Sequence, residues 1–88
     1  MSTPRTIDDV LADARSRIAR VEAVDVPAEL ADGAVLVDIR PAAQRAEEGE
    51  APGALVIERN VLEWRCDPAS DARIDQAVDH DVRWIVLC

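Results

Sequence analysis

Two short stretches decide the fold of this chain, Val35-Leu36-Val37-Asp38-Ile39 and Trp84-Ile85-Val86-Leu87. Both are nearly continuous apolar runs rather than alternations of apolar and polar residues. Such runs are typical of strands that are buried on both faces of a parallel sheet. Residues 24–26 and 55–57 are shorter apolar runs and weaker strand candidates. The sequence therefore predicts a parallel sheet with its two strongest strands at residues 35–39 and 84–87.

Short helices are predicted between these strands. One opens at Pro27, with proline in its first position, and Gly33 closes it. Another opens at Pro41, and Gly49 closes it, before a turn at Pro52-Gly53. Strands that alternate with short helices indicate an α/β fold, in which ligands bind beyond the carboxyl ends of the strands.

The first segment is predicted to be an amphipathic helix over residues 7–20. Its apolar residues recur at helical spacings: Ile7, Val10, Leu11, Ala14, Ile18 and Val21. Thr6 is a credible N-cap, and Asp9 three residues later completes an approximate capping box. The apolar stripe has two interpretations, binding to a partner or packing onto the domain, and we favour packing because such stripes usually face a core. We therefore divide the chain into this helix, at residues 1–22, and a domain at residues 23–88.

Length, charge and cysteine count restrict the class of function. Eighty-eight residues allow one small domain, and ten arginines against eighteen acids give a net charge of −8. A protein that binds nucleic acid or an anionic membrane needs the opposite charge. No apolar run approaches the roughly 18 residues of a membrane span, no signal-peptide core is present, and two cysteines do not make a disulfide framework. We expect a cytoplasmic protein that binds neither nucleic acid nor membrane.

Three stretches in order resemble the rhodanese-like (sulfurtransferase) family: Leu36-Val37-Asp38-Ile39-Arg40-Pro41, then Gly49-Glu50-Ala51-Pro52-Gly53-Ala54, then Trp84-Ile85-Val86-Leu87-Cys88. In that family a strand ends in an Asp-x-Arg element, a Gly-His-Ile-Pro-Gly-Ala-like turn precedes the next strand, and a later strand delivers a nucleophilic cysteine. The resemblance covers about residues 24–88 and implies a parallel sheet flanked by helices. Glu50 and Ala51 depart from it, because the family usually has His and Ile there.

The resemblance implies a two-step sulfur transfer without a cofactor. Cys88 as thiolate attacks the outer sulfur of a donor such as thiosulfate and becomes a persulfide, and cyanide or a thiol then removes that sulfur. Arg40 is expected to attract the anionic donor, and Asp38 to anchor Arg40 or the neighbouring loop. Some members hold the substrate with an arginine six residues after the aspartate. Arg45 lies one residue beyond that place, so it is a weaker substrate-binding candidate.

The chain stops at Cys88, where family members continue with a loop whose N–H groups point at the cysteine sulfur. Such donors, a helix N-terminus or nearby cations activate a thiolate. We therefore expect residues 23–88 to be the N-terminal part of a rhodanese-like domain whose C-terminal third is missing, inactive or incomplete as an 88-residue chain. The loss leaves parallel strands with an uncovered edge, which is the reason to consider a remnant that does not fold, and self-association that covers the exposed sheet stays open.

Three other functions stay open at this point. They are a non-catalytic rhodanese-like binding module, a truncated remnant that does not fold, and a phosphatase with a related cysteine loop. In the non-catalytic interpretations Cys88 is an inert buried thiol. Asp38 and Arg40 are then an ordinary surface ion pair, which contributes about 0 to 1 kcal/mol.

The remaining candidates for chemistry receive structural interpretations. Cys66 is interpreted as a loop or packing residue because no Cys-x-x-Cys spacing supports a second active thiol. Trp64 is assigned to the core. A metal set of Cys66, His80 and Cys88 with an aspartate matches no common zinc spacing, so no metal is predicted.

Overall fold

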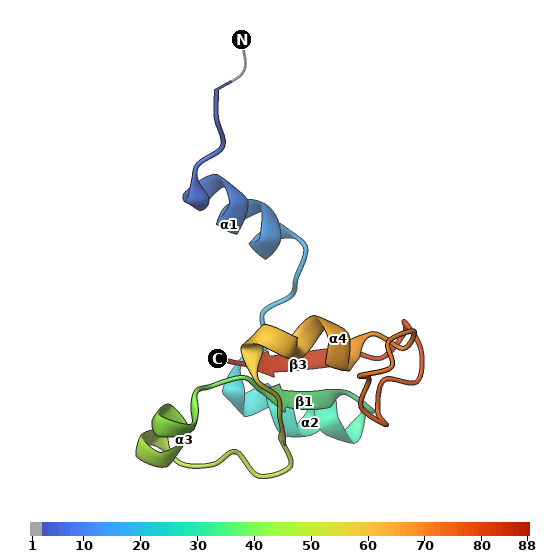
Figure 1. Ribbon diagram of the computed structural model, residues 1–88. Coiled ribbons are helices and arrows are strands. Elements are labelled where there is room, and N and C mark those ends of the chain that lie inside the picture. The colour runs from blue at the N-terminus through green and yellow to red at the C-terminus, as the bar shows by residue number, and fades with distance from the viewer. Residues whose placement is uncertain (1–2) are drawn as a thin grey trace.

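The computed structural model describes residues 3–88 and shows a small α/β fold (Figure 1). Three parallel strands form one sheet in the order β2-β1-β3. The strands are β1 (Val35–Asp38), β2 (Leu55–Val56) and β3 (Trp84–Leu87). The helices are α1 (Ile7–Ser16), α2 (Val26–Ala31), α3 (Ala42–Glu48) and α4 (Leu62–Cys66), with 3₁₀ turns η1 (Ala23–Asp25) and η2 (Arg59–Val61). The predicted parallel α/β fold is confirmed, and it is consistent with a rhodanese-like fold.

The central strand β1 forms the core of the molecule because it has a neighbour on each side. Val37 pairs with Leu55 of β2 and Val86 of β3, and its side chain is fully buried. The strand ends one residue earlier than predicted, although the Ile39 N–H still donates to the Leu87 carbonyl at 3.0 Å. β3 is not buried on both faces as expected, because Val86 is 43% exposed. Among the described residues β3 has a neighbouring strand on one side only.

Residues 24–26 do not form the strand that their apolar character suggests. They belong to η1 and to the first residue of α2. Pro27 lies in the first turn of α2, where its missing N–H has no intrahelical partner in any case. Proline therefore initiates a helix here and overrides the strand preference of the valines. The expected helix after Pro41 is α3, and Gly49 closes it with a φ of +95°.

The helix α1 forms with the predicted capping box. The Asp9 N–H donates to Thr6 Oγ1 at 3.1 Å, and the Thr6 N–H donates to Asp9 Oδ2 at 2.9 Å. The helix ends at Ser16, four residues before the predicted end, where the Ser16 hydroxyl donates to the Asp13 carbonyl at 2.6 Å. Such side-chain bonds to the backbone compete with continuation of a helix.

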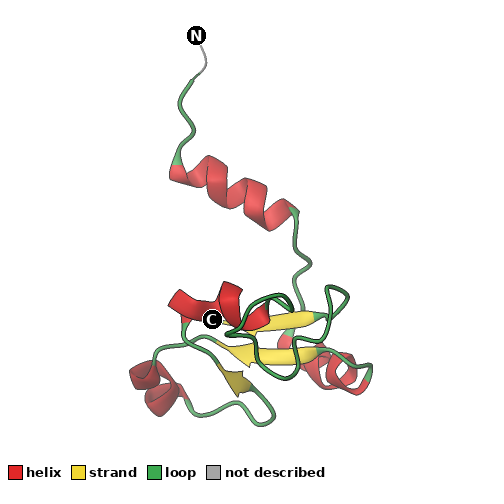
Figure 2. Ribbon diagram, turned by 45° about the vertical axis from the view of Figure 1, so that its right-hand side comes forward, coloured by secondary structure: helices red, strands yellow, loops and turns green. Residues whose placement is uncertain are grey.

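The apolar stripe of α1 does not pack onto the domain, so the interpretation we favoured is wrong. Every residue of α1 is exposed, and Ile7 is 78% exposed. Figures 1 and 2 show α1 standing clear of the sheet at the end of a short linker. The radius of gyration is correspondingly 15.1 Å, against about 12 Å for a compact domain of this length.

Helices lie on both faces of the sheet and beyond its carboxyl end. Figure 1 shows α4 and α2 on opposite faces, and α3 beside the end of the sheet at which β3 and the chain end. Trp64 lies in α4 and is 59% exposed, so its assignment to the core is wrong. No helix within residues 3–88 is long and apolar enough to cross a membrane.

The strand order generates a stability prediction. Val37 and Val86 are paired across β1 and β3, but only Val37 is fully buried. Val37→Ala removes two buried methyl groups and leaves a cavity, so we expect a loss of about 2–3 kcal/mol in the free energy of unfolding. The matched change Val86→Ala is expected to lower the free energy of unfolding by about 1 kcal/mol or less, because Val86 is partly exposed. Urea denaturation measures both, and equal losses would contradict the central position of β1.

Candidate functional site at the carboxyl ends of the strands

A buried ion pair marks the carboxyl end of β1. Arg40 Nη2 donates to Asp38 Oδ2 at 2.8 Å, and Arg40 Nε lies 3.0 and 3.2 Å from the two carboxylate oxygens. The backbone N–H of Arg40 also donates to Asp38 Oδ1, at 3.0 Å. Asp38 is fully buried and Arg40 is 8% exposed. The alternative of an ordinary surface pair is therefore wrong.

Arg40 also reaches the end of α3. Its Nη1 donates to Glu48 Oε2 at 3.1 Å, and its Nη2 donates to the Gly49 carbonyl at 2.9 Å. All three guanidinium nitrogens of Arg40 thus have hydrogen-bond acceptors. The carboxylates of Asp38 and Glu48 offset its positive charge. The expectation that Arg40 attracts an anionic donor does not fit this geometry. Arg40 instead ties the end of β1 to the end of α3.

The electrostatics of the pair keep both groups charged. The hydrogen bond from Arg40 lowers the pKa of Asp38, and it outweighs burial, which acts in the opposite direction. The same hydrogen bond raises the pKa of Arg40 above its already high ordinary value. Asp38 is an ionised acceptor at neutral pH, as its predicted anchoring role requires, and it is not poised to act as a base.

Arg45 lies next to this pair. Its Nη1 donates to the Arg40 carbonyl at 2.8 Å. Its Nε is 3.5 Å from Glu50 Oε2 without hydrogen-bond geometry, and it is buried with no hydrogen-bond partner among the described residues. Glu50 stands where the rhodanese-like family usually has His. Its carboxylate lies beside Arg45, the arginine that stands one residue beyond the position that binds substrate in some family members.

A depression of about 440 Å³ opens beside Arg45. It lies at the carboxyl ends of β1 and β2, the edge of a parallel sheet where ligands bind in α/β folds. Its charged lining consists of Arg40, Arg45, Arg59 and Glu58. Each of these arginines already faces a carboxylate: Arg40 is paired with Asp38 and Glu48, Arg59 Nη1 lies 2.7 Å from Glu63 Oε1, and Arg45 Nε lies 3.5 Å from Glu50 Oε2. Arg45 is the arginine in this lining with the weakest pairing.

Cys88 follows the last residue of β3 at the same edge of the sheet. Leu87 is paired with Asp38, so the register brings Cys88 alongside the residues that follow Asp38. Its thiol is free and exposed, which excludes the alternative of a buried inert cysteine. Cys88 is not among the residues that line the depression.

Cys66 differs from Cys88 in its surroundings. It is the last residue of α4 rather than a loop residue, and it is half-buried. Burial, and then the charge of Glu63, raise the pKa of the Cys66 thiol, which disfavours the nucleophilic thiolate. Within residues 3–88, no three His, Cys, Asp or Glu side chains are arranged to hold a metal ion.

Sequence comparison does not place the chain in a family, because no family model matches it and no curated protein is significantly similar. The fold is similar to a solved structure from Rhodopseudomonas palustris CGA009, a protein of unknown function called a possible tyrosine phosphatase. The TM-score is 0.78 at 26% identity, and the match covers 100% of this chain and 68% of the other. The likeness therefore extends over α1 as well as the sheet.

The Asp38–Arg40 pair generates a pH prediction. Because the folded chain lowers the pKa of Asp38 below its ordinary 3.8, ionised Asp38 stabilises the fold at pH values above that number. This stabilisation is lost as the pH falls through the lowered pKa. We expect Asp38→Asn to be less stable than wild type at about pH 6, with a difference that shrinks toward about pH 3.

Urea denaturation across that pH range provides the measurement. Asp75→Asn is the matched control, because Asp75 is exposed. A difference between wild type and Asp38→Asn that stays constant with pH would contradict the assigned ion pair.

Proposed function

We propose that this chain carries the nucleophile of a rhodanese-like sulfurtransferase, with Cys88 as the sulfur carrier. One observation carries the proposal. The exposed thiol of Cys88 follows β3, and β3 pairs with β1, the strand that leads into the buried Asp38–Arg40 ion pair. Arg45, which lines the depression at the same edge of the sheet and whose Nε has no hydrogen-bond partner among residues 3–88, supports an anionic donor of the thiosulfate type.

The proposed reaction has two balanced steps. In the first, the Cys88 thiolate attacks the outer sulfur of thiosulfate, a cysteine–sulfur bond forms, and the sulfur–sulfur bond of thiosulfate breaks with its electron pair on sulfite. In the second, cyanide or a thiolate attacks the outer sulfur of the persulfide. Thiocyanate or a new persulfide leaves, and the Cys88 thiolate is regenerated. No cofactor takes part.

The residues around Cys88 have different proposed roles. Arg45 binds the anionic donor, since its Nε is buried beside the depression without a hydrogen-bond partner among residues 3–88. Asp38 and Arg40 act as positioning residues, because their hydrogen bonds to each other and to Gly49 hold the segment between β1 and α3 in place. That segment contacts β3 through the hydrogen bond from Ile39 to Leu87.

The two cysteines allow a matched test of the nucleophile. Incubation with thiosulfate is expected to add one sulfur atom to the intact mass of the wild type, and cyanide is expected to release it as thiocyanate. Cys66→Ser is expected to behave like wild type, and Cys88→Ser to lose both signals. Mass spectrometry with a thiocyanate assay makes the measurement. Persulfide formation that survives in Cys88→Ser would overturn the assignment.

Arg45 generates a kinetic prediction. Arg45→Gln removes a charged donor, so in the sulfurtransferase for which this chain supplies the nucleophile we expect the KM for thiosulfate to rise about tenfold with little change in kcat. Arg45→Lys is expected to recover part of the loss because it restores the charge. Arg20→Gln makes the same change of charge at an exposed site in the linker and is expected to leave KM unchanged. An equal effect of Arg20→Gln and Arg45→Gln would show that only net charge matters.

A cysteine-dependent phosphatase is the second candidate, and the likeness to the possible tyrosine phosphatase favours it. In that reaction the Cys88 sulfur attacks the phosphorus of a phosphate monoester, the alcohol leaves, and water then releases phosphate. Hydrolysis of p-nitrophenyl phosphate that depends on Cys88, without persulfide formation, would favour the phosphatase. A folded chain with neither activity would favour a non-catalytic rhodanese-like module.

A further inference from the structure

The depression beside Arg45 also contains a carboxylate that has no partner. Glu58 lines it, and its side chain makes no ion pair or hydrogen bond among residues 3–88. The other two arginines of the lining, Arg40 and Arg59, are held by carboxylates that lie outside it. A ligand in this depression therefore meets one weakly paired cation, Arg45, and one unpaired anion, Glu58.

The backbone holds Glu58 at the carboxyl end of β2. The preceding residue, Ile57, is 5% exposed, and its N–H donates to the Asp38 carbonyl at 3.1 Å. The Glu58 carbonyl accepts from the Val61 N–H at 3.1 Å, at the start of η2. Glu58 and Arg45 thus belong to segments that follow two neighbouring strands, β2 and β1, and no ion pair joins the two side chains.

The depression adjoins the proposed nucleophile. Ile39 lines it, and the Ile39 N–H donates to the carbonyl of Leu87, the residue before Cys88. Its volume of about 440 Å³ is within the range of small-molecule sites. A small ligand held between the two charges therefore lies beside the end of β3. The uncharged residues of the lining are Ile39, Pro41, Ala42, Val56, Ile57 and Asn60.

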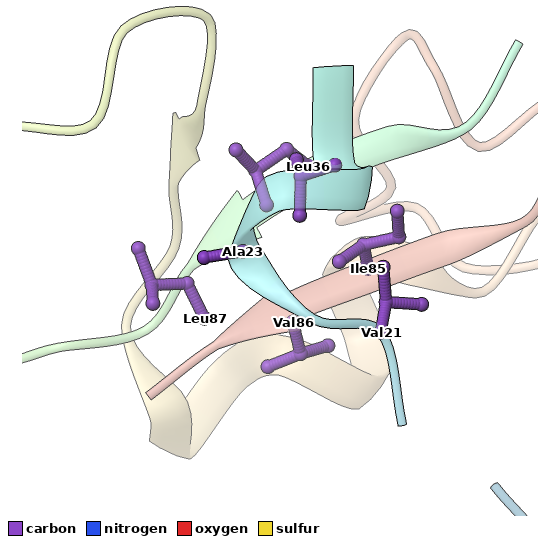
Figure 3. Close-up of a pocket in the computed structure, with 7 residues that line it drawn as sticks. Val21, Ala23, Leu36, Ile85, Val86 and Leu87 are labelled. Carbon is purple, nitrogen blue, oxygen red and sulfur yellow. The ribbon is translucent and has the colours of Figure 1, made fainter. Parts of the chain in front are cut away.

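A further depression, of about 270 Å³, has a different character. It lies where the linker from α1 meets the sheet, and its lining is entirely aliphatic, with Leu36 of β1 and Ile85 of β3 among its residues (Figure 3). It has no charged side chain to orient a charged ligand. The two opposite charges distinguish the depression beside Arg45 from it.

A ligand that carries both charges matches this lining better than an anion or a cation does. An anion at Arg45 is repelled by Glu58, and a cation at Glu58 is repelled by Arg45. A zwitterion with its carboxylate at Arg45 and its ammonium group at Glu58 has an opposite charge beside each of its own. Thiosulfate uses the Arg45 contact alone, so the second charge is left for the other substrate, the acceptor.

We propose that this depression binds a small zwitterion, and that the sulfur acceptor is a thiol with an ammonium and a carboxylate group, such as cysteine. The identity of the acceptor rests on the proposed function, whereas the zwitterion site does not. The acceptor loses its thiol proton to solvent and attacks the outer sulfur of the Cys88 persulfide. A bond forms between these two sulfurs, and the bond to Cys88 Sγ breaks with its electron pair on Sγ. The products are the persulfide of the acceptor and the Cys88 thiolate.

Three probes without a thiol test the site apart from sulfur chemistry. L-serine carries a hydroxymethyl, an ammonium and a carboxylate group. 3-hydroxypropionate lacks the ammonium group, and ethanolamine lacks the carboxylate. NMR titration of the isotope-labelled wild type follows the backbone N–H signals of Ile39, Ala42 and Asn60 in the lining. L-serine is expected to bind more tightly than either of the other probes.

Two variants are expected to act in opposite directions on the probes. Glu58→Gln is expected to weaken L-serine binding about threefold, the effect of one partly exposed charge contact, and to strengthen 3-hydroxypropionate binding. Arg45→Gln is expected to weaken the binding of both and to strengthen ethanolamine binding. Glu47→Gln makes the same change of charge at an exposed acid outside the depression, and it is expected to leave L-serine binding unchanged.

The acceptor is tested on the Cys88 persulfide of the wild type and of Glu58→Gln. Transfer to cysteine, cysteamine or 3-mercaptopropionate is followed as the loss of one sulfur atom from the intact mass. Glu58→Gln is expected to slow transfer to cysteine about threefold and to speed transfer to 3-mercaptopropionate. The ratio of the two rates for each thiol cancels the intrinsic reactivity of that thiol.

Three results would overturn the proposal. L-serine that binds no more tightly than 3-hydroxypropionate would exclude a site for a zwitterion. A weakening of both probes alike in Glu58→Gln would assign Glu58 a structural role instead of a charge contact. Transfer to cysteine that is unchanged in Glu58→Gln would exclude the zwitterionic acceptor. A chain that forms no Cys88 persulfide would overturn the proposed function instead, and L-serine binding would then decide the site alone.

Discussion

The buried contact between Asp38 and Arg40 is the interaction on which the arrangement of the site depends. Transfer of two charges out of water is unfavourable unless their hydrogen bonds are satisfied, and here Asp38, Glu48 and the Gly49 carbonyl supply an acceptor for each guanidinium nitrogen. The pair therefore constrains more than two side chains. It joins the end of the central strand β1 to the end of α3. It therefore determines the path of the chain at the carboxyl-end edge of the sheet, where ligands bind in parallel α/β folds.

The parallel sheet accounts for the rest of the site. Parallel strands bring their carboxyl ends to one edge, which places Cys88 after β3 beside the residues that follow β1. Arg45 then comes to the same edge because α3 is attached to β1 through Arg40, and its backbone contact with the Arg40 carbonyl orients it. Arg45 thus lies at the edge of the sheet where ligands bind in parallel α/β folds, beside a depression whose other two arginines are paired with carboxylates.

The same small sheet also explains the exposed helix. A domain of this size buries a modest fraction of its surface, and one side of β3 has no neighbouring strand among the described residues. Residues 23–88 carry the whole net charge, whereas residues 1–22 are balanced. The net negative charge therefore lies in residues 23–88 and not in the segment that contains α1.

Local patterns in the sequence determined the parallel strands, the capping box of α1 and the glycine that ends α3, because each depends on neighbouring residues or on a continuous apolar run. The order of the Asp-x-Arg element and Cys88 also pointed to one edge of the sheet. Only the tertiary structure decided that Asp38 and Arg40 are buried, that Glu50 contacts Arg45, and that Trp64 and the stripe of α1 are exposed. Burial and pairing depend on which distant segments cover a residue, and an apolar pattern is the same whether its partner lies in its own domain or in another molecule.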